Sequence, residues 1–254
     1  MDGATQTPGQ GGTVRIAAIG DLHCTRAAQG LLAPLLQQAA AAADVLALCG
    51  DLTDYGLPEE AQVLARELSG VRAQVVAVLG NHDHESGHAG EVQKILAGAG
   101  VHVLDGEAVE LHGIGIAGVK GFAGGFGRHT LGPWGEGAIK SFVREALDEA
   151  LKLESALARL RTPQRVALLH YAPIAGTVEG EPREIYPFLG SSRLEEPLVR
   201  YPVTAVCHGH AHKGALEGKM SNGVPVYNCA LPLLRRARPD GPPFRLLEFQ
   251  TEPV

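Results

Sequence analysis

Three short apolar runs, each closed by a glycine and then a polar residue, constrain the fold of this chain more than any other feature. The runs are Val14–Ile19, Val45–Cys49 and Gln74–Leu79, and the residues that follow their glycines are Asp21, Asp51 and Asn81, thirty positions apart. Apolar runs of this length bounded by turn residues are typical of buried strands. The intervening segments, Leu31–Ala43 and Pro58 to Ser69, have helical composition. Repeated strand–helix units predict a parallel or mixed sheet with helices on its faces.

The rest of the chain predicts a second set of strands. We expect them at Val101–Leu104, Ala108–Leu111, Ile114–Val119, Val166–Leu169, Val203–Cys207, Val224–Tyr227 and Phe244–Phe249. Ile139–Leu160 has the composition of a long helix, Lys120–Gly137 is a glycine-rich loop, and the stretch between Tyr171 and Pro197 is rich in loops. No internal repeat is evident, so we expect a flexible tail over residues 1–12 and a single domain over residues 13–254.

The composition excludes several classes of protein. Apolar residues make up 45% of the chain and charged residues 20%, as in an ordinary soluble domain, and the net charge is −6. We therefore expect no stable nucleic-acid binding, which needs clustered Lys and Arg. The apolar runs are too short to span a membrane, and the N-terminus lacks the pattern of a signal peptide. Four scattered cysteines without a Cys-x-x-Cys pair favour reduced thiols and a cytoplasmic location.

The polar residues after the first three strands are expected to meet, because ligands bind at the carboxyl ends of strands in open α/β sheets. If the first strand stays extended through Leu22, Asp21 and His23 lie on the same side of it. Two later strands are followed by histidines, one at position 170 and a pair that flanks Ala211. The sequence therefore predicts a cluster of polar side chains at one end of the sheet.

This cluster has the composition of a metal centre. It comprises seven side chains: Asp21, His23, Asp51, Asn81, His170, His210 and His212. Carboxylate, amide and imidazole groups together suit Mn, Fe or Zn. Seven ligands are too many for one tetrahedral ion and suit two ions that share a carboxylate. Bound cations would also let an acidic protein accept a phosphate substrate.

Five sequence blocks resemble the signature of the calcineurin-like metallophosphoesterases, and they occur in the order found in that family. The blocks are Asp21-x-His23, Gly50-Asp51-x-x-Asp54, Gly80-Asn81-His82-Asp83, His170, and Gly209-His210-x-His212. Taken singly, Asp and Asn after glycine are common turn residues, and a lone histidine is more often structural. The presence of all five blocks in the order of the family favours a functional metal site over these structural interpretations. The resemblance implies an α/β (α+β) fold of two facing mixed sheets flanked by helices.

The resemblance also implies a role for each matching residue. Asp21, His23 and His212 would hold the first metal ion, and Asp51 would bridge to the second. Asn81, His170 and His210 would complete the second ion. His82 would face the phosphate, steadying its charge or protonating the leaving oxygen, and Asp54 would orient His82. Manganese is the metal we favour, with iron or zinc as the alternatives.

These roles predict a metal-dependent phosphoesterase that hydrolyses a small phosphodiester with a water or hydroxide activated by two metals. Protein Ser/Thr phosphatases of the family have an arginine where this chain has Tyr55, which favours the smaller phosphodiesterase-like branch. One alternative is a phosphomonoesterase acting on a nucleotide or sugar phosphate. Another is a non-catalytic scaffold of the same fold, which would tolerate the loss of ligands.

Several residues beside the blocks have open roles. We expect His84, His88 and His208 to be surface histidines, with phosphate binding as the alternative. The glycine-rich loop is either a lid, with Arg128 and His129 reaching a phosphate, or a plain connection. We interpret the cysteines near the blocks, Cys24, Cys49 and Cys207, as small apolar fillers, the alternative being a redox-sensitive rim.

Overall fold

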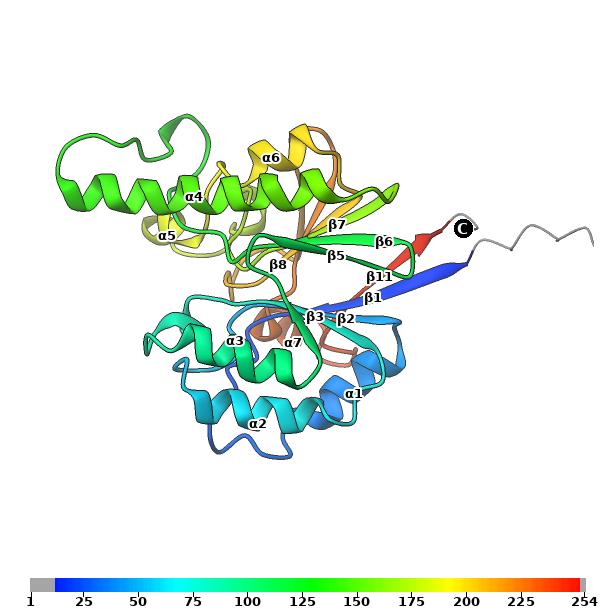
Figure 1. Cartoon of the computed structure of the whole chain (residues 1–254). Coiled ribbons are helices and arrows are strands. Elements are labelled where there is room, and N and C mark those ends of the chain that lie inside the picture. The colour runs from blue at the N-terminus through cyan, green and yellow to red at the C-terminus, as the bar shows by residue number, and fades with distance from the viewer. Residues whose placement is uncertain (1–11, 252–254) are drawn as a thin grey trace, which may run out of the picture.

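The computed structural model describes residues 12–251, which form two β-sheets packed face to face with helices on both outer sides (Figure 1). This is the fold class predicted from the sequence. The predicted tail, apart from Gly12, and residues 252–254 lie outside the described residues. Within residues 12–251, the search for helices of sufficient length and hydropathy to cross a membrane finds none.

The first sheet has the order β11-β1-β2-β3-β4. Its strands are β1 (Thr13–Ile19), β2 (Val45–Cys49), β3 (Gln74–Val78), β4 (Val101–Val103) and β11 (Arg245–Gln250). Strands β1 to β4 are parallel, and β11 runs antiparallel to β1. The helices α1 (Ala33–Ala41), α2 (Pro58–Leu68) and α3 (Ala89–Gly98) cover the outer face of this sheet (Figure 1).

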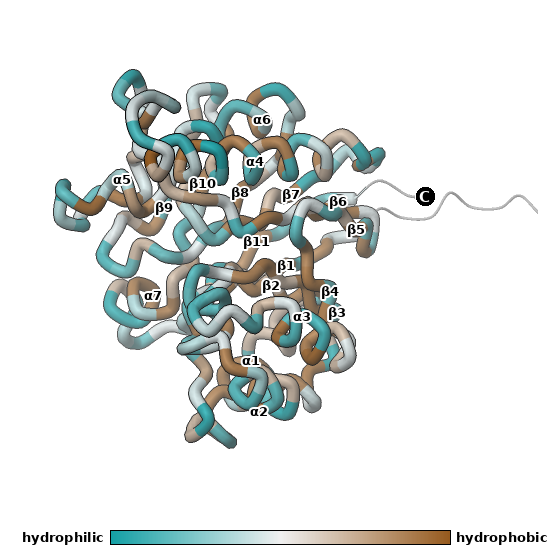
Figure 2. Tube along the Cα trace, turned by 60° about the vertical axis from the view of Figure 1, so that its left-hand side comes forward, coloured by the Kyte–Doolittle hydropathy of each residue, from teal (hydrophilic) through white to brown (hydrophobic). Residues whose placement is uncertain are grey.

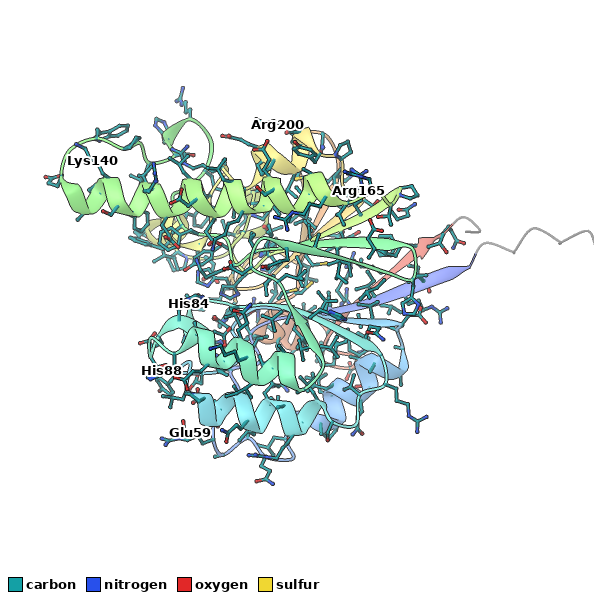
Figure 3. All side chains as sticks on the ribbon, viewed as in Figure 1. Glu59, His84, His88, Lys140, Arg165 and Arg200 are labelled. Carbon is teal, nitrogen blue, oxygen red and sulfur yellow. The ribbon has the colours of Figure 1, made fainter. Side chains whose placement is uncertain are left out.

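The second sheet has the order β5-β6-β7-β8-β10-β9. Its strands are β5 (Glu107–Leu111), β6 (Ile114–Gly118), β7 (Gln164–Leu168), β8 (Ala205–His208), β9 (Glu217–Lys219) and β10 (Pro225–Asn228). The inner four strands are parallel, and β5 and β9 are antiparallel edges. The outer helices are α4 (Gly137–Arg159) and α6 (Glu195–Arg200), whose exposed Lys140 and Arg200 are labelled in Figure 3. Two further short helices are α5 (Tyr186–Leu189), between β7 and β8, and α7 (Leu231–Ala237), between β10 and β11.

Alternate residues of β1 serve different layers. Val14, Ile16 and Ala18 belong to the core between the two sheets, whereas Ala17 and Ile19 pack in the core under the helices. A strand buried on both faces needs an apolar residue at every position, which is why β2 and the second half of β1 are continuous apolar runs, whereas Arg15 in the first half of β1 is exposed. In Figure 2 the tube is mostly hydrophobic (brown) along the central strands, and the hydrophilic (teal) segments lie mostly on the outside.

The structure contains elements that the sequence patterns did not indicate. These are α3, α5, α6, α7 and β9. Helix α3 buries only Val92 and Leu96, so its apolar periodicity is weak. Helices α5 and α6 are short and lie in the stretch predicted to be rich in loops. The remaining predicted elements are present, with ends that agree or are shifted by one or two residues.

Candidate functional site

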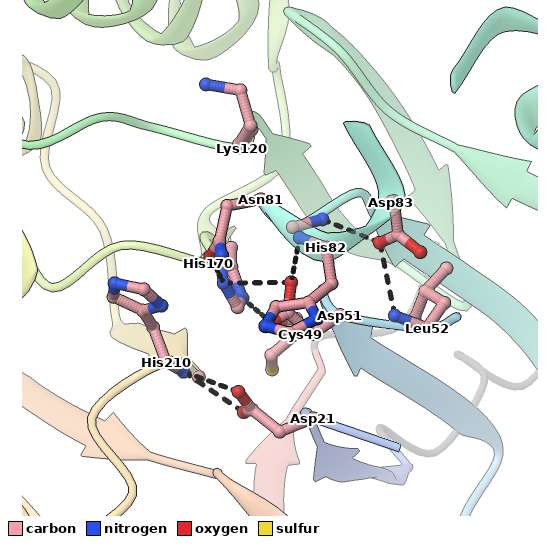
Figure 4. Close-up of polar contacts among 12 residues, drawn as sticks. Asp21, Cys49, Asp51, Leu52, Asn81, His82, Asp83, Lys120, His170 and His210 are labelled. Atoms are coloured by element: carbon pink, nitrogen blue, oxygen red, sulfur yellow. Dashed lines mark hydrogen bonds and ion pairs between the residues drawn. The ribbon is translucent and has the colours of Figure 1, made fainter. Parts of the chain in front are cut away.

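The carboxyl ends of β1, β2, β3, β7 and β8 bring together every residue of the predicted metal centre. Three groups of side chains have ligand atoms within 4.8 Å of one another: Asp21, His23 and His212; Asp51, His170 and His210; His23, Asp54 and His82. The remaining member, Asn81, has its Oδ1 atom 2.9 Å from His170 Nε2. Figure 4 labels five members of this cluster and draws their polar contacts: Asp21, Asp51, Asn81, His170 and His210. Segments up to 191 residues apart therefore form one site.

The backbone reaches the site by left-handed turns, and the prediction of an extended segment through Leu22 is wrong. Strand β1 ends at Ile19, after which φ is +56° at Asp21 and +44° at His23; φ is +48° at Asp51 and +69° at His210. Residues with a Cβ atom rarely adopt this conformation, which costs on the order of 1–3 kcal/mol each. Strain of this kind persists where surrounding contacts impose it, and here it coincides with four of the predicted ligands.

The glycines of the blocks are required by close packing around the carboxylates and an imidazole. A Cβ atom at Gly80 would lie 2.1 Å from Asp51 Oδ1, and one at Gly209 would lie 2.4 Å from Asp21 Oδ2. A Cβ atom at Gly50 would lie 2.5 Å from His170 Nδ1. Each glycine therefore makes room for a side chain of the site, in addition to ending a strand.

Asp51 lies at the centre of the cluster and is 1% exposed. Its Oδ1 atom accepts the backbone N–H of His82 at 2.9 Å and is 3.3 Å from His170 Nε2. Its Oδ2 atom is on the other side, 3.8 Å from His23 Nε2. The two oxygens of one carboxylate thus face two different groups of ligands.

His170 presents a lone pair to two oxygen atoms. Its ring is fully buried, and Nδ1 is 2.9 Å from the carbonyl oxygen of Cys49. A carbonyl oxygen can only accept a hydrogen bond. The proton of the neutral ring is therefore on Nδ1, and Nε2 carries the lone pair. That lone pair faces Asn81 Oδ1 at 2.9 Å and Asp51 Oδ1 at 3.3 Å. Three electron-rich atoms converge here, an arrangement that a cation between them would stabilise.

Asp21 and the two C-terminal histidines form the other half of the centre. The backbone N–H of His210 lies 3.0 Å from both Asp21 oxygens, and His212 Nε2 is 2.9 Å from Oδ1. Burial alone would raise the pKa of Asp21, but the hydrogen bond and charge of His212 and the other histidines lower it overall. The same hydrogen bond raises the pKa of His212. The Asp21 carboxylate is thus kept ionised.

His210 is held so that one ring nitrogen is free for the site. Nε2 donates to the carbonyl oxygen of Phe188 at 3.1 Å, which leaves the lone pair on Nδ1. The Tyr171 ring packs on this imidazole, with the ring centroids 4.4 Å apart. Burial lowers the pKa of His210 to about 3. A neutral imidazole is the form that can bind a metal ion.

His82 lies beside the ligands and is oriented by a backbone group. Its Nδ1 donates to the carbonyl oxygen of Asp54 at 2.7 Å, so the contact with Asp54 is through the main chain. The Asp54 carboxylate instead lies 3.2 Å from His23 Nδ1. Burial lowers the pKa of His82, but the Asp54 carbonyl and the charges of Asp51 and Asp54 outweigh it, and the pKa is raised overall.

Asp83 supports the site and was not given a role from the sequence. Its fully buried carboxylate accepts the backbone N–H groups of Leu52, Thr53 and Gly80, at 3.1, 2.8 and 2.7 Å, and the Thr53 hydroxyl at 2.6 Å. It thus joins the segments that follow β2 and β3, which carry Asp51 and Asn81. The only signal was its place at the end of the third block.

The structure divides the neighbouring residues whose roles were left open into buried and exposed ones. His208 is buried, with Nε2 2.8 Å from the Thr177 hydroxyl, so the prediction of a surface position is wrong. Burial lowers the pKa of His208 to about 4. His84 and His88 are exposed, and Arg128 and His129 hydrogen-bond to each other on an exposed turn. All four cysteines are free and buried, which agrees with the filler interpretation.

The sequence comparison identifies the family. Residues 14–214 match the family model of the calcineurin-like phosphoesterases, and the chain belongs to this family. Members hydrolyse phosphate esters in metal-dependent reactions and generally use two divalent ions. The chain is therefore a metal-dependent phosphoesterase by family. No curated protein sequence gives a significant match.

Solved structures share the fold at low sequence identity. Phosphopantetheinyl hydrolase (PptH) from Mycobacterium tuberculosis is 15% identical with a TM-score of 0.66, and the match covers 91% of this chain and 95% of that chain. GAP50, the anchor in the inner membrane complex of Plasmodium, is 13% identical with a TM-score of 0.53, covering 87% and 72%. A putative 5′-nucleotidase from Staphylococcus aureus is 15% identical with a TM-score of 0.53, covering 85% and 48%. These likenesses concern the fold, and the names differ too widely to assign a substrate.

Proposed function

We propose that this chain is a phosphodiesterase that uses two divalent transition-metal ions, with manganese as the preferred metal. One ion would be held by Asp21, His23 and His212, and the other by Asn81, His170 and His210. Asp51 would serve both ions. The observation that carries this proposal is the position of Asp51, whose two oxygens face His170 and His23 respectively.

The residues present fit such ions. Both ring nitrogens of His23 are buried and have no hydrogen-bond partner among residues 12–251. The His170 lone pair faces two oxygens rather than a donor. Buried polar atoms without partners are costly, and a coordinated cation would remove that cost. Mixed oxygen and imidazole ligands suit Mn, Fe and Zn, and the carboxylate and amide oxygens favour manganese among them.

Different residues of the chain would have different roles in the proposed reaction. When bound, two divalent ions make a water molecule acidic near neutral pH and polarise the phosphoryl oxygens. His82, with Nδ1 fixed on the Asp54 carbonyl, has Nε2 free to donate a proton to the leaving oxygen. The raised pKa of His82 keeps more of the ring protonated at neutral pH than an ordinary histidine would have. Asp83 keeps the segments of Asp51 and Asn81 in register.

The preference for diesters rests on Tyr55. The chain has this tyrosine directly after Asp54, where the protein phosphatases of the family have arginine. A monoesterase on a nucleotide or sugar phosphate is the alternative, and a 5′-nucleotidase is among the proteins of similar fold. A scaffold role, which the name of GAP50 describes for another protein of this fold, is disfavoured because every predicted ligand is present and converges.

A substrate panel tests the proposal. Purified protein is freed of metal, reloaded with Mn²⁺, and assayed with 4-nitrophenyl phosphate, bis(4-nitrophenyl) phosphate and 2′,3′- and 3′,5′-cyclic nucleotides. Higher kcat/KM on the diesters supports the proposal. Faster turnover of the monoester would replace it with the monoesterase. Metal binding without turnover of any ester would favour the scaffold.

A further inference from the structure

A small cavity lies beside the metal centre and is not used by the reaction described above. It has a volume of about 220 Å³ and lies between α3 and the segment that follows β6. Its lining includes Leu79, His84, Gly90, Gln93, Leu104 and Lys120. Pockets that enclose a whole drug-sized ligand have roughly 300–1,000 Å³, so this one suits one part of a substrate.

The cavity adjoins the predicted ligands through hydrogen-bonded backbone. The backbone N–H of His84 donates to the carbonyl oxygen of Asn81 at 3.1 Å. The carbonyl oxygen of Lys120 accepts the backbone N–H of His170 at 3.0 Å. Figure 4 shows Lys120 on the same side of the cluster as Asn81, with its ammonium end directed away from Asn81, and Figure 3 labels His84 at the edge of the layer that carries α3. The cavity is therefore bordered by segments that are hydrogen-bonded to the backbone of Asn81 and His170.

The lining combines an apolar wall with polar groups, and its carboxylate, Asp105, is paired with Lys152 Nζ at 2.9 Å, which balances its charge. Leu79, Val103 and Leu104 supply the apolar part, and Gln93 supplies a neutral amide. A neutral amide offers both a donor and an acceptor to a bound group. Such a lining, mostly apolar with a few polar groups, is typical of a site for an organic group.

Lys120 adds hydrogen-bond donors without free charge. Its side chain is 11% exposed, and Nζ makes one hydrogen bond, to the Gly121 carbonyl at 2.7 Å. Glu145 and Glu149 lie 3.8 and 3.9 Å from Nζ, close enough to balance its charge but too far for hydrogen bonds. Among residues 12–251, two N–H groups of this ammonium therefore have no acceptor. Because the charge is already balanced, a neutral carbonyl oxygen suits these donors better than a second anion.

We infer that this cavity binds an uncharged organic arm of the substrate that carries a carbonyl acceptor, such as a pyrimidine base or an amide. The inference rests on the proposed function, since it assigns the group attached to the phosphate that is hydrolysed there. It makes the substrate a mixed diester, with one arm recognised by the cavity and the phosphate recognised at the metal centre.

Two glycines of α3 provide a matched pair of variants. Gly90 lines the cavity and Gly98 does not, and a Cβ atom added at either meets no heavy atom within 4 Å. Leucine is a better helix former than glycine at both positions, so neither Gly90→Leu nor Gly98→Leu should unfold the chain. Gly90→Leu places a bulky side chain at the wall of the cavity, and Gly98→Leu controls for the change in the helix.

The variants are compared on two diesters that share a leaving group. These are methyl 4-nitrophenyl phosphate and thymidine 5′-(4-nitrophenyl phosphate). We expect Gly90→Leu to lower kcat/KM for the thymidine ester by about tenfold or more, mainly through KM, and to leave the methyl ester unchanged. Gly98→Leu should match the wild type on both. Equal effects of Gly90→Leu on the two esters, or no effect on either, would overturn the inference.

A binding measurement keeps this test separate from the proposed function. Free thymidine is titrated into metal-free protein and followed by ligand-observed NMR. We expect binding by the wild type and Gly98→Leu, with loss in Gly90→Leu. If the wild type hydrolyses neither diester, the proposed function fails while this titration still decides whether the cavity takes the base. No binding of thymidine to the wild type would overturn the inference even where the diesters are hydrolysed.

Discussion

The Nδ1–H group of His170 donates to the carbonyl oxygen of Cys49 at 2.9 Å, and this single contact fixes which nitrogen of a fully buried imidazole faces the site. Cys49 is the last residue of β2, and His170 comes two residues after β7. A backbone carbonyl of one sheet thus sets the tautomer of a predicted metal ligand carried by the other. Metal-binding histidines commonly have their second nitrogen held in this way.

The first prediction concerns metal content. Purified protein should hold two transition-metal ions per chain, because the two oxygens of Asp51 face two groups of candidate ligands, one through His170 and the other through His23. A chelator should abolish hydrolysis, and Mn²⁺ should restore it. Elemental analysis together with activity checks both statements. A single weakly held ion, with activity insensitive to chelator, would contradict the two-metal site.

The second prediction concerns the shared carboxylate. Asp51→Asn should lower the rate by more than about 100-fold, beyond the 10–100-fold typical of residues that only support a ligand. An amide cannot give two cations a shared negative oxygen, so they would repel each other at close range. Asn81→Ala should have a smaller effect. Near-normal rate and metal content in Asp51→Asn would show that Asp51 does not bridge.

The third prediction separates proton donation from metal binding. His82→Ala should keep its metal and lose about 10²–10⁴-fold in rate on esters with poor leaving groups such as alkoxides. The loss should be much smaller on 4-nitrophenyl esters, since 4-nitrophenolate leaves without protonation. Equal losses on both types would leave charge stabilisation as the role of His82. Loss of metal would instead make His82 a ligand.

The fourth prediction follows from the position of Asp54. The carbonyl oxygen, not the carboxylate, holds His82, and the carboxylate faces His23. Asp54→Asn should therefore preserve the leaving-group dependence of the wild type and instead weaken metal binding. Measurements of metal affinity, and of the ratio of rates on alkyl and 4-nitrophenyl esters, distinguish a role of the carboxylate in metal binding from a role in orienting His82. A ratio that shifts as in His82→Ala would show that the carboxylate does govern His82.

The fifth prediction concerns the contribution to stability of a buried carboxylate that joins α2 to the start of α1. The Glu67 carboxylate in α2 is buried and accepts the backbone N–H groups of Gly30, Leu32 and Ala33 at 2.6, 2.9 and 2.8 Å, at the start of α1. Glu67→Gln should lower the free energy of unfolding by about 1.5–3 kcal/mol at pH 7. Glu59→Gln, at an exposed position of the same helix, is the control and should cost under about 1 kcal/mol.

The pH dependence of this effect has a defined sign. Burial raises the pKa of Glu67, but the three backbone hydrogen bonds outweigh it and lower the pKa below its ordinary value of 4.5. The stability it contributes is therefore complete above about pH 4.5 and is lost as the pH falls through the lowered pKa. Urea unfolding of wild type and Glu67→Gln at pH 7 and at pH 3 should show the difference shrinking. A constant difference would contradict the linkage.

The sequence predicted the strands of both sheets except β9, and it predicted the convergence of the metal-centre residues for a physical reason. Parallel strands place their carboxyl ends together, so the residues after β1, β2 and β3 had to meet. The left-handed turns at Asp21 and His23 were not predictable, because they depend on backbone hydrogen bonds that these two residues donate to the carbonyl oxygens of Gly50 and Asp51, just after β2.

Other features could not be predicted because they depend on partners distant in the chain. The burial of His208 follows from its contact with Thr177, and the orientation of Asp54 follows from His23. Helix α3 lacks a strong apolar stripe, since only Val92 and Leu96 are buried. In each case the local residue types were compatible with more than one environment.

The antiparallel pairing of β1 with β11 has a consequence for the order of folding. β1 lies inside the first sheet, yet one of its two neighbours comes from the far end of the chain, and the paired residues Thr13 and Gln250 are 237 positions apart in the sequence. A pairing of such long range forms slowly, because a large loop must close first. Until residues 245–250 have emerged from the ribosome, β1 therefore remains an open, apolar edge, and such edges promote aggregation. Chains that stop before Arg245 should thus depend on chaperones, although they contain every residue of the metal centre.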